Sequence, residues 1–430
     1  MHMMWNGKPY YDHPPMGFWF MALSYRLFGI SEFSTRLPSA VAGLLTILFV
    51  YLFAVELFGK KTIGFVASLI LGTSVWYLIR VRSGNLESIF VFFYILTVYL
   101  SLKSSKDFRW FPLVMISFGA LVLAKTLVGV SAIVLILFLN VRQFFKKKHI
   151  GYVLLGIGGF IALVYPWYKV QMSTYSDFIQ HHFFTVGMRD KTIASYFKLM
   201  IDQPFFYLHM GVRKWYYIWL LSIGYLVISL TFLKKHIFFL FLWNFIVLYP
   251  FLTSEKTELW HLIPVYLALS FISSVGVYEA LFFVRSILLK ILPHTSMFKI
   301  ITREHLYTVT YLLFFATVAV LQIRVFTPEV FAQTRYTPDD VAISKLAGKY
   351  NKTLYLDDDF VPLAVYYSDT IVYPLAYQPD DKKTLVKLFQ SPEKNFIVIT
   401  RNWAINNLKK DNIPYKIVDK NNSFTIVTRP

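Results

Sequence analysis

Long apolar stretches recur along the chain between Leu37 and Val325. Several of them approach the roughly 20 residues that a helix needs to cross the hydrocarbon core of a membrane. Only 16% of the 430 residues are charged, against roughly 25% in a soluble domain. So few charged side chains cannot cover a surface that faces water. The sequence therefore predicts an integral membrane protein that crosses the bilayer many times.

The apolar pattern predicts an α-helical polytopic membrane domain with about ten spans. The predicted spans are Leu37–Leu57, Ile63–Ile79, Leu86–Leu102, Trp110–Ala124, Leu127–Asn140, Gly151–Tyr168, Trp215–Leu233, Ile237–Leu252, Leu262–Val284 and Tyr307–Ile323. The segment Met16–Gly29 follows two prolines and is apolar and aromatic, but it carries Arg26. We expect a helix there that lies in the membrane interface.

Basic residues mark alternate connections between the predicted spans. They are Lys60, Lys61, Lys103, Lys106, Arg109, Arg142, Lys146, Lys147, Lys148, Lys234, Lys235, Arg285, Lys290, Lys299 and Arg303. Because Lys and Arg collect in cytoplasmic loops, the pattern places these connections in the cytoplasm. The N-terminal segment, the connections at 80–87, 125, 169–214 and 253–261, and the C-terminal region then face the other side of a plasma or inner membrane.

The formal net charge of +19 suits anionic membrane lipids, and we expect no nucleic-acid partner. The chain has no cysteine, which excludes disulfides and thiolate metal sites.

The composition changes after Phe326, where short β-type runs replace the long apolar stretches. Expected strands are Lys352–Leu356, Thr370–Tyr373, Phe396–Thr400, Tyr415–Val418 and Ser423–Val427, and expected helices are Pro338–Tyr350 and Asp380–Phe389. The sequence thus predicts three parts: a segment 1–36, a membrane domain 37–326, and a small extracytoplasmic α/β domain 327–430 of about 100 residues. Asp357, Asp358 and Asp359 fit a solvated turn better than a metal site.

Charged side chains near span ends on the extracytoplasmic side require a reason. They include Arg80, Glu87, Lys125, Arg189 and Lys256. Each of them alone fits a solvated or snorkelling side chain. Together they bring several cations and a few acids to one membrane surface, which suits an anionic, lipid-linked substrate, because phosphate is bound by Lys and Arg and group transfer uses a carboxylate.

The most specific motif is the run Tyr11-Asp12-His13-Pro14-Pro15-Met16, followed about twenty residues later by Arg36-Leu37-Pro38-Ser39. This pattern resembles the bacterial members of the GT-C glycosyltransferases, in the dolichyl-phosphate-mannose protein mannosyltransferase and aminoarabinose transferase group. The resemblance continues at Arg80…Glu87, Ala124-Lys125-Thr126 with Gly129, Pro166-Trp167-Tyr168, 178–184 with Arg189, Ser254-Glu255-Lys256, and His261-Leu262-Ile263-Pro264.

The resemblance implies a sugar donor linked to polyprenyl phosphate, an acceptor lipid, glycan or protein, and transfer with inversion. It makes Glu87 and Asp12 the candidate catalytic acids. It places Lys125, Arg189 and Lys256 on the phosphate, with His13 at the position of a frequent lysine. Tyr11, Arg80 and His261 would line the same substrate cavity.

Some relatives hold a divalent metal between the acidic residue before the proline pair and histidines of the long outer loop. The resemblance therefore suggests Asp12, His181 and His182 as metal ligands, and an Asp with two His is a reasonable set for zinc. Adjacent histidines rarely bind one ion together, so histidines at a wet interface are the alternative.

One departure from the family pattern is large. The family's principal catalytic Asp lies upstream of the proline pair, after a first span, and this sequence starts a few residues before that pair. We therefore expect that the sequence is truncated at its N-terminus and that residues 1–430 alone are inactive or nearly so.

Three alternatives stay open: a lipid or solute transporter or flippase, a polymer ligase acting on a lipid diphosphate, and an inactive binding or scaffold relative. The transporter explains the spans, although transporter sites usually lie near the bilayer centre at interrupted helices.

Overall fold

The computed structural model describes residues 3–188, 198–254, 258–291, 304–332, 337–375 and 385–430. It forms two compact units. One unit is helical and comprises Tyr11–Phe331, and the other joins Met1–Tyr10 to Ala332–Pro430. The first ten residues therefore fold with the C-terminal part of the chain.

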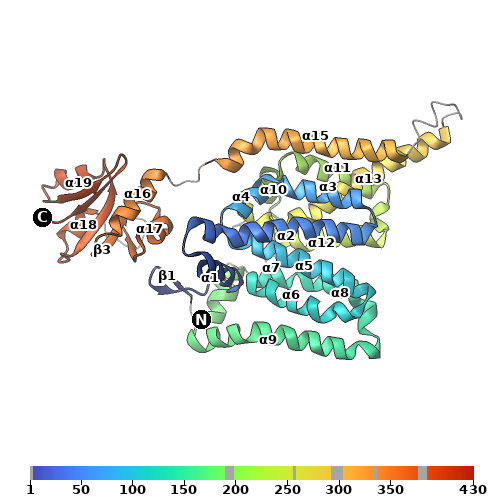
Figure 1. Cartoon of the computed structure of the whole chain (residues 1–430), viewed down its shortest axis with the longest axis horizontal. Helices are drawn as coiled ribbons and strands as arrows, with labels where there is room; N and C mark the ends of the chain where they lie inside the picture. Colours follow the sequence, from blue (N-terminus) through green and yellow to red (C-terminus); the bar gives the residue numbers. More distant parts are fainter. Residues whose placement is uncertain (1–2, 189–197, 255–257, 292–303, 333–336, 376–384) are drawn as a thin grey trace. The chain divides into compact units, whose positions relative to one another are not determined.

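The helical unit is a bundle of long helices that lie side by side, with α15 and α9 on opposite flanks (Figure 1). Its elements are α1 (Met16–Phe28), α2 (Glu32–Phe58), α3 (Lys61–Gly72), α4 (Val75–Arg82), α5 (Leu86–Lys106), η1 (Phe108–Trp110), α6 (Phe111–Ala124), α7 (Thr126–Val130), α8 (Ala132–Phe144), η2 (Lys147–His149), α9 (Ile150–Thr174), η3 (Gln180–Met188), α10 (Asp202–Val212), α11 (Lys214–Ile228), η5 (Thr231–Leu233), α12 (Lys235–Leu252), η6 (Leu259–Leu262), α13 (Val265–Ile291) and α15 (Glu304–Phe331).

Within the described residues, 7 helices are long and apolar enough to cross a membrane, and α3 with α4 forms a bent pair that could make an eighth span. Two shorter apolar helices, Phe108–Ala124 and Lys214–Ile228, correspond to the remaining predicted spans. The predicted polytopic helical fold is confirmed. The prediction missed that the stretch 63–79 bends by 68° between Gly72 and Val75, and that α9 continues to Thr174.

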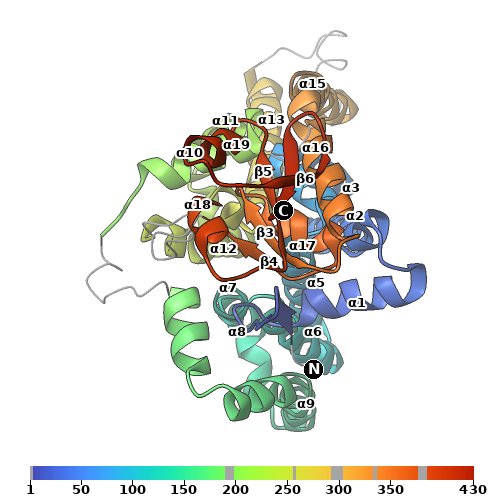
Figure 2. The ribbon, with the colours of Figure 1, turned by 90° about the vertical axis from the view of Figure 1, so that its left-hand side faces the viewer.

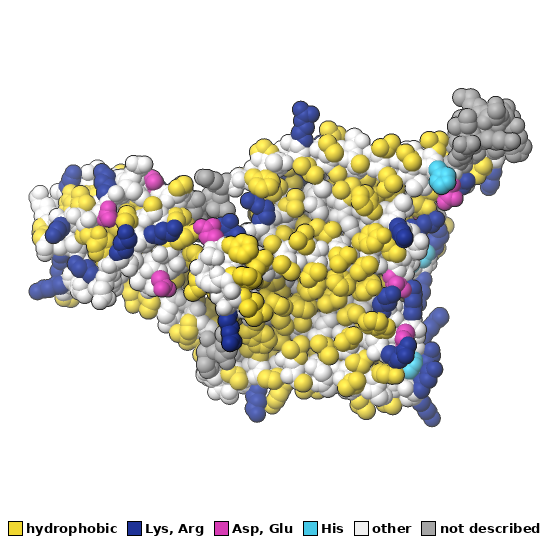
Figure 3. Space-filling view, viewed as in Figure 1, with side chains coloured by type: hydrophobic (Ala, Val, Ile, Leu, Met, Phe, Trp, Pro, Cys, Tyr) yellow, Lys and Arg dark blue, Asp and Glu magenta, His cyan; other side chains and the backbone are white. Residues whose placement is uncertain are grey.

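The basic connections gather at one end of the helical unit, as Figure 3 shows for the lysine and arginine side chains. Ion pairs join neighbouring connections there. Glu56 near the end of α2 accepts from Lys103 at 2.6 Å and from Lys106 at 2.5 Å, and Lys234 lies 3.3 Å from Glu279 of α13. We call this the basic end of the bundle, and its opposite the outer end.

At the outer end, α1 begins directly after the proline pair and ends at Gly29, whose φ of 75° closes the helix. Ser31 then starts α2 with a reciprocal capping box, in which the Ser31 hydroxyl accepts from the Ser34 backbone and the Ser34 hydroxyl accepts from the Ser31 backbone. Leu27 and Phe28 of α1 are exposed, which fits the expected interfacial helix; its depth in a membrane stays a prediction.

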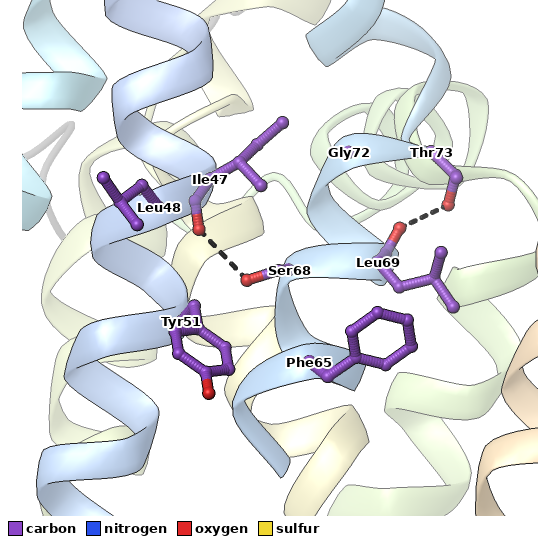
Figure 4. A pocket seen from close by; sticks show the side chains of 8 residues that line it. All are labelled: Ile47, Leu48, Tyr51, Phe65, Ser68, Leu69, Gly72 and Thr73. Atoms are coloured by element: carbon purple, nitrogen blue, oxygen red, sulfur yellow. Dashed lines mark hydrogen bonds between the residues drawn. The ribbon is translucent and has the colours of Figure 1, made fainter. Parts of the chain in front are cut away.

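An apolar cavity of about 410 Å³ lies between α2 and α3. Figure 4 shows Tyr51 and Leu48 of α2 facing Phe65 and Leu69 of α3 across it. The cavity reaches Gly72 and Thr73, so one of its ends is the break between α3 and α4.

The other unit contains a five-stranded sheet in the order β4-β3-β5-β7-β6. β3 pairs in parallel with β4 and β5, and β7 pairs antiparallel with β5 and β6. Helices cover both faces, with α16 and α17 on one and α18 and α19 on the other (Figure 2). The elements are α16 (Pro338–Ala347), β3 (Thr353–Asp357), α17 (Val361–Ser368), β4 (Val372–Pro374), α18 (Leu385–Gln390), β5 (Phe396–Arg401), α19 (Ile405–Lys410), β6 (Lys416–Lys420) and β7 (Phe424–Thr428).

The predicted α/β fold of this unit is confirmed, including all five strands. The helices α17 and α19 were not predicted, and the beginning of the expected helix 380–389 lies outside the described residues. The carboxylates at the end of β3 have protein partners: Asp357 accepts from the Thr400 hydroxyl at 2.7 Å, and Asp358 pairs with Arg401. Burial raises the pKa of Asp357. This arrangement fits a hydrogen-bonded turn.

A short hairpin, β1 (Met4–Trp5) and β2 (Lys8–Pro9), packs on the edge of this sheet. The side chain of Asn6 donates to the Val372 carbonyl at 2.7 Å and accepts from the Val372 N–H at 2.8 Å. The amide thus pairs with edge strand β4 as a neighbouring strand would. It covers backbone groups that an open edge leaves available to other chains.

Candidate functional site at the outer end of the bundle

Glu87 and Lys125 meet at the outer end of the bundle. Asn85 caps α5 by accepting from the Glu87 N–H at 3.0 Å, which places Glu87 in the first helical turn. Lys125 occupies the extended residue between α6 and α7. Its Nζ lies 3.5 Å from Glu87 Oε1, and the two side chains keep only 25% and 16% of their exposure. A carboxylate and an ammonium group therefore share a largely buried position.

His13, which precedes the proline pair, faces the same pair of charges. Burial lowers the pKa of His13, and the nearby charge of Lys125 lowers it further, while Glu87 and Asp12 act in the opposite direction. The net decrease favours a neutral imidazole. The sequence prediction that Glu87, Lys125 and His13 share one place therefore agrees with this geometry.

A second group of polar side chains surrounds Tyr11 and Asp12. The Asp12 carboxylate lies 2.6 Å from His181 Nε2, and the Tyr11 hydroxyl donates to Asp177 at 2.9 Å. The Tyr11 ring stacks on Tyr175 at 4.5 Å and meets His181 edge-on at 4.9 Å. Burial and the hydrogen bond to Asp177 raise the pKa of Tyr11, so the phenol stays protonated.

His182 connects the two groups. Its Nδ1 donates to the Tyr11 carbonyl at 3.0 Å, so the neutral ring accepts through Nε2 from the Thr126 hydroxyl, also at 3.0 Å. Thr126 in turn lies 2.6 Å from the Tyr168 hydroxyl. Burial lowers the pKa of His182. The residue next to Lys125 is thereby bonded to the segment that carries Asp12 and His13.

The geometry does not form the suggested three-ligand metal site. Asp12 and His181 are in contact, but both ring nitrogens of His182 have partners in the protein. Over the part of the chain that the structure describes, no group of three His, Cys, Asp or Glu is placed to hold a metal ion. A metal at Asp12 and His181 would need further ligands from outside this set.

Arg80 lies in α4, so the expected 80–87 loop is shorter than predicted and spans only the residues between α4 and α5. Its guanidinium stacks on Trp260 at 4.4 Å and lies 5.5 Å from the Trp76 ring. His261 follows Trp260 in η6, where its Nδ1 accepts from the Glu258 N–H at 3.1 Å. Arg189 and Lys256, both predicted phosphate contacts, lie outside the described residues.

Several residues of the site had no role predicted from the sequence: Asp177, Thr126, Tyr168 and Trp260. Asp177 could have been found from the sequence, because it directly precedes the motif 178–184 and lies one helical turn before His181. Thr126 follows the flagged Lys125 directly. Trp260 gave no signal, since single tryptophans are common at membrane interfaces.

Comparison with known proteins gives consistent matches. The family described as dolichyl-phosphate-mannose-protein mannosyltransferase matches residues 12–168. A putative mannosyltransferase of Bacillus subtilis, YkcB, is 31% identical over 93 residues, which cover 22% of this chain and 13% of that protein. An undecaprenyl phosphate-alpha-4-amino-4-deoxy-L-arabinose arabinosyl transferase of Aeromonas hydrophila is 39% identical over 64 residues, covering 15% and 12%.

Among solved structures, ArnT from Cupriavidus metallidurans bound to undecaprenyl phosphate superposes with a TM-score of 0.66 at 15% identity, over 99% of this chain and 89% of that one. This likeness shows a shared fold. The chain is a multi-pass membrane protein that shares this fold. The predicted resemblance to the bacterial GT-C mannosyltransferase and aminoarabinose transferase group is confirmed, on segments that span less than a fifth of the length of the curated relatives.

Proposed function

We propose that this protein transfers a glycosyl group from a polyprenyl-phosphate donor to an acceptor at the extracytoplasmic face of a cell membrane. The observation that carries the proposal is the Glu87–Lys125 pair beside His13. All three residues lie in the segment 12–168 that matches the mannosyltransferase family. The basic end of the bundle faces the cytoplasm in this proposal, which puts the pair on the other side.

In the proposed reaction, an acceptor hydroxyl or phosphate attacks the anomeric carbon, and polyprenyl phosphate leaves with inversion at that carbon. Glu87 accepts the proton of the attacking group or orients it. Lys125 stabilises the charge that develops on the leaving phosphate. Their mutual contact holds both side chains in place before substrate arrives.

Asp12, Tyr11 and His181 would form a second wall of the substrate cavity. Their hydrogen bonds fix the segment before the proline pair. Arg80, stacked on Trp260, adds a cation at the same end of the bundle. Such stacking leaves the N–H edges of a guanidinium available to phosphate oxygens. No step in this mechanism passes through a metal.

We place the lipid part of the donor in an apolar cavity of the helical unit. It has a volume of about 360 Å³ and lies between α1, α2 and α5, lined by residues such as Phe20, Leu45 and Phe92. Helix α1 begins at Met16, directly after the proline pair, and α5 begins at Leu86, directly before Glu87. A lipid chain in this cavity would thus run along two helices that begin close to His13 and Glu87.

The test is transfer of radiolabelled sugar from a polyprenyl-phosphate donor by membranes that contain the protein. We expect transfer by the full-length protein, and its loss when the protein carries Glu87→Gln or Lys125→Ala. Donors with different sugars, offered with lipid, glycan and protein acceptors, would identify the substrates.

The transporter alternative predicts a different result from the same variants. If both variants transfer sugar as the unmodified protein does, while movement of a labelled lipid across the membrane is lost, the site serves transport.

A further inference from the structure

The outer end of the helical unit contains two helix interruptions that come together at one buried side chain. The first separates α3 from α4 at Thr73, with a bend of 68°. The second separates α10 from α11 at Arg213, whose φ of 54° and ψ of −118° are unusual for a residue with a side chain. Interrupted helices leave backbone N–H and C=O groups without partners in their own helix, which is costly away from water.

Gln322 of α15 supplies those partners. Its side chain is fully buried, and its amide nitrogen donates to the Thr73 carbonyl at 2.8 Å and to the Val212 carbonyl at 3.1 Å. Its amide oxygen accepts from the Lys214 N–H at 3.0 Å. One glutamine thus satisfies the end of α3, the end of α10 and the beginning of α11.

A further hydrogen bond links Thr73 to α11. The indole N–H of Trp215, in the first turn of α11, donates to the Thr73 hydroxyl at 3.0 Å. That hydroxyl donates back to the Leu69 carbonyl at 2.6 Å, as Figure 4 shows. The two interruptions are therefore bonded to each other as well as to α15.

The residues that follow the interruptions belong to the outer end. α4 carries Arg80, which stacks on Trp260, and leads through the Asn85 cap to Glu87. Two helical turns beyond Gln322, on the same face of α15, Glu329 accepts two hydrogen bonds of 2.8 Å from Arg213. The direction of α4 relative to α3 depends on the hydrogen bonds at Thr73, because the backbone leaves the helical path there.

We propose that Gln322 is a positioning residue for the site: it holds the interruption before α4 in the geometry that presents Arg80 to the donor phosphate. The part that concerns the donor rests on the proposed function. Methionine has nearly the same volume but lacks the three hydrogen-bonding groups, and glutamate keeps the acceptor but lacks the two N–H donors. Neither side chain can replace the amide.

The first test measures the mobility of spin labels and needs no substrate. The chain has no cysteine, so a single Ser83→Cys carries a spin label directly after α4, and Ser286→Cys carries one on an exposed part of α13 as a reference. We expect Gln322→Met to increase the mobility of the label at Ser83 and to leave the label at Ser286 unchanged. An unchanged label at Ser83 would overturn the proposal.

The second test measures transfer. We expect Gln322→Met to raise the donor KM about tenfold, with kcat changed less than about twofold, because the lost bonds act through the phosphate contacts. In an Arg80→Ala background, Gln322→Met should add little, since both changes act through the same contact. Full additivity of the two changes would contradict positioning through Arg80.

Asn140→Leu is the matched control. Asn140 is also fully buried, and its amide donates to the Ser101 hydroxyl at 2.8 Å and the Ile136 carbonyl at 3.1 Å, within α5 and α8. It should lower thermal stability without changing the donor KM. A protein that transfers no sugar at all would refute the proposed function, and the label at Ser83 would still decide the role of Gln322.

Discussion

The two ends of the helical bundle hold charged side chains under opposite conditions. At the basic end, Lys106 keeps 57% and Lys234 keeps 51% of their exposure, and each forms an ion pair with one carboxylate. At the outer end, Arg213 keeps only 15%, donates two hydrogen bonds to Glu329, and lies 4.9 Å from the ring of Phe326. These cations are therefore exposed at the basic end and largely buried at the outer end.

This difference teaches where substitutions should matter. An exposed ion pair contributes little, because water screens it and the side chains lose entropy when they pair. A buried charge that loses its partner is expensive. Matched substitutions at the two ends should therefore differ in their effects on activity and on stability.

The largest effect is expected for Glu87→Gln. Removing a group that accepts a proton in the transition state should lower kcat for sugar transfer about 100-fold or more. The matched change at the basic end is Glu56→Gln, which removes the partner of Lys103 and Lys106 and should leave kcat unchanged. Equal losses in both variants would show that the acid at the outer end has no special role.

The next effect concerns stability. Arg213→Met leaves Glu329 without its bidentate partner, and we expect a loss of about 2 kcal/mol, below the roughly 3–5 kcal/mol of a fully buried pair, because Glu329 keeps 35% of its exposure. Lys234→Met should change stability by less than about 0.5 kcal/mol. Thermal unfolding in detergent measures the stability of both variants. A tolerated Arg213→Met would mean that its pair is as dispensable as those of the basic end.

A smaller effect is expected where a cation stacks on an aromatic ring. Trp260→Leu removes the ring beside Arg80, and we expect the donor KM to rise about fivefold, corresponding to about 1 kcal/mol. Tyr99→Leu removes the ring 5.8 Å from Lys103 at the basic end and should leave the donor KM unchanged. A donor KM that responds to both variants would remove the contrast between the ends.

The smallest effect is a pH dependence. Burial lowers the pKa of His182 below its usual 6.5, so the unfolded chain binds this proton more readily than the folded chain. Stability should therefore be fully present above pH 6.5 and decline as the pH falls from there toward the lower folded pKa. The decline should be weaker in His182→Gln than in His305→Gln, a change at an exposed position of α15. Identical pH profiles would argue against a neutral, buried His182.

Much of the fold could be predicted because its signals are local. β-Branched and aromatic runs marked the strands β3 and β5, and apolar stretches marked the long helices. α17 and α19 were missed because they have only 8 and 6 residues, too few to show a helical period. The bend after Gly72 was missed because hydropathy continues through it.

The candidate site was predicted in part for a similar reason. Glu87 and Lys125 could be singled out because charges are rare at the ends of apolar spans, and His13 because it belongs to the motif around the proline pair. The roles of Gln322 and Asn6 could not be predicted, because an uncharged amide carries no such signal. Each of them also forms a hydrogen bond with a residue more than two hundred positions away in the sequence. Their importance depends on which backbone N–H and C=O groups have no hydrogen-bond partner within their own helix or strand.

The pairing of Asn6 with the edge of the sheet has a mechanical consequence. The chain passes between the two units twice, once after Tyr10 and once after Phe331. Changing Asn6 would release the first residues of the chain from the sheet. The connection after Phe331 would then be the single link between the C-terminal residues and the helical unit.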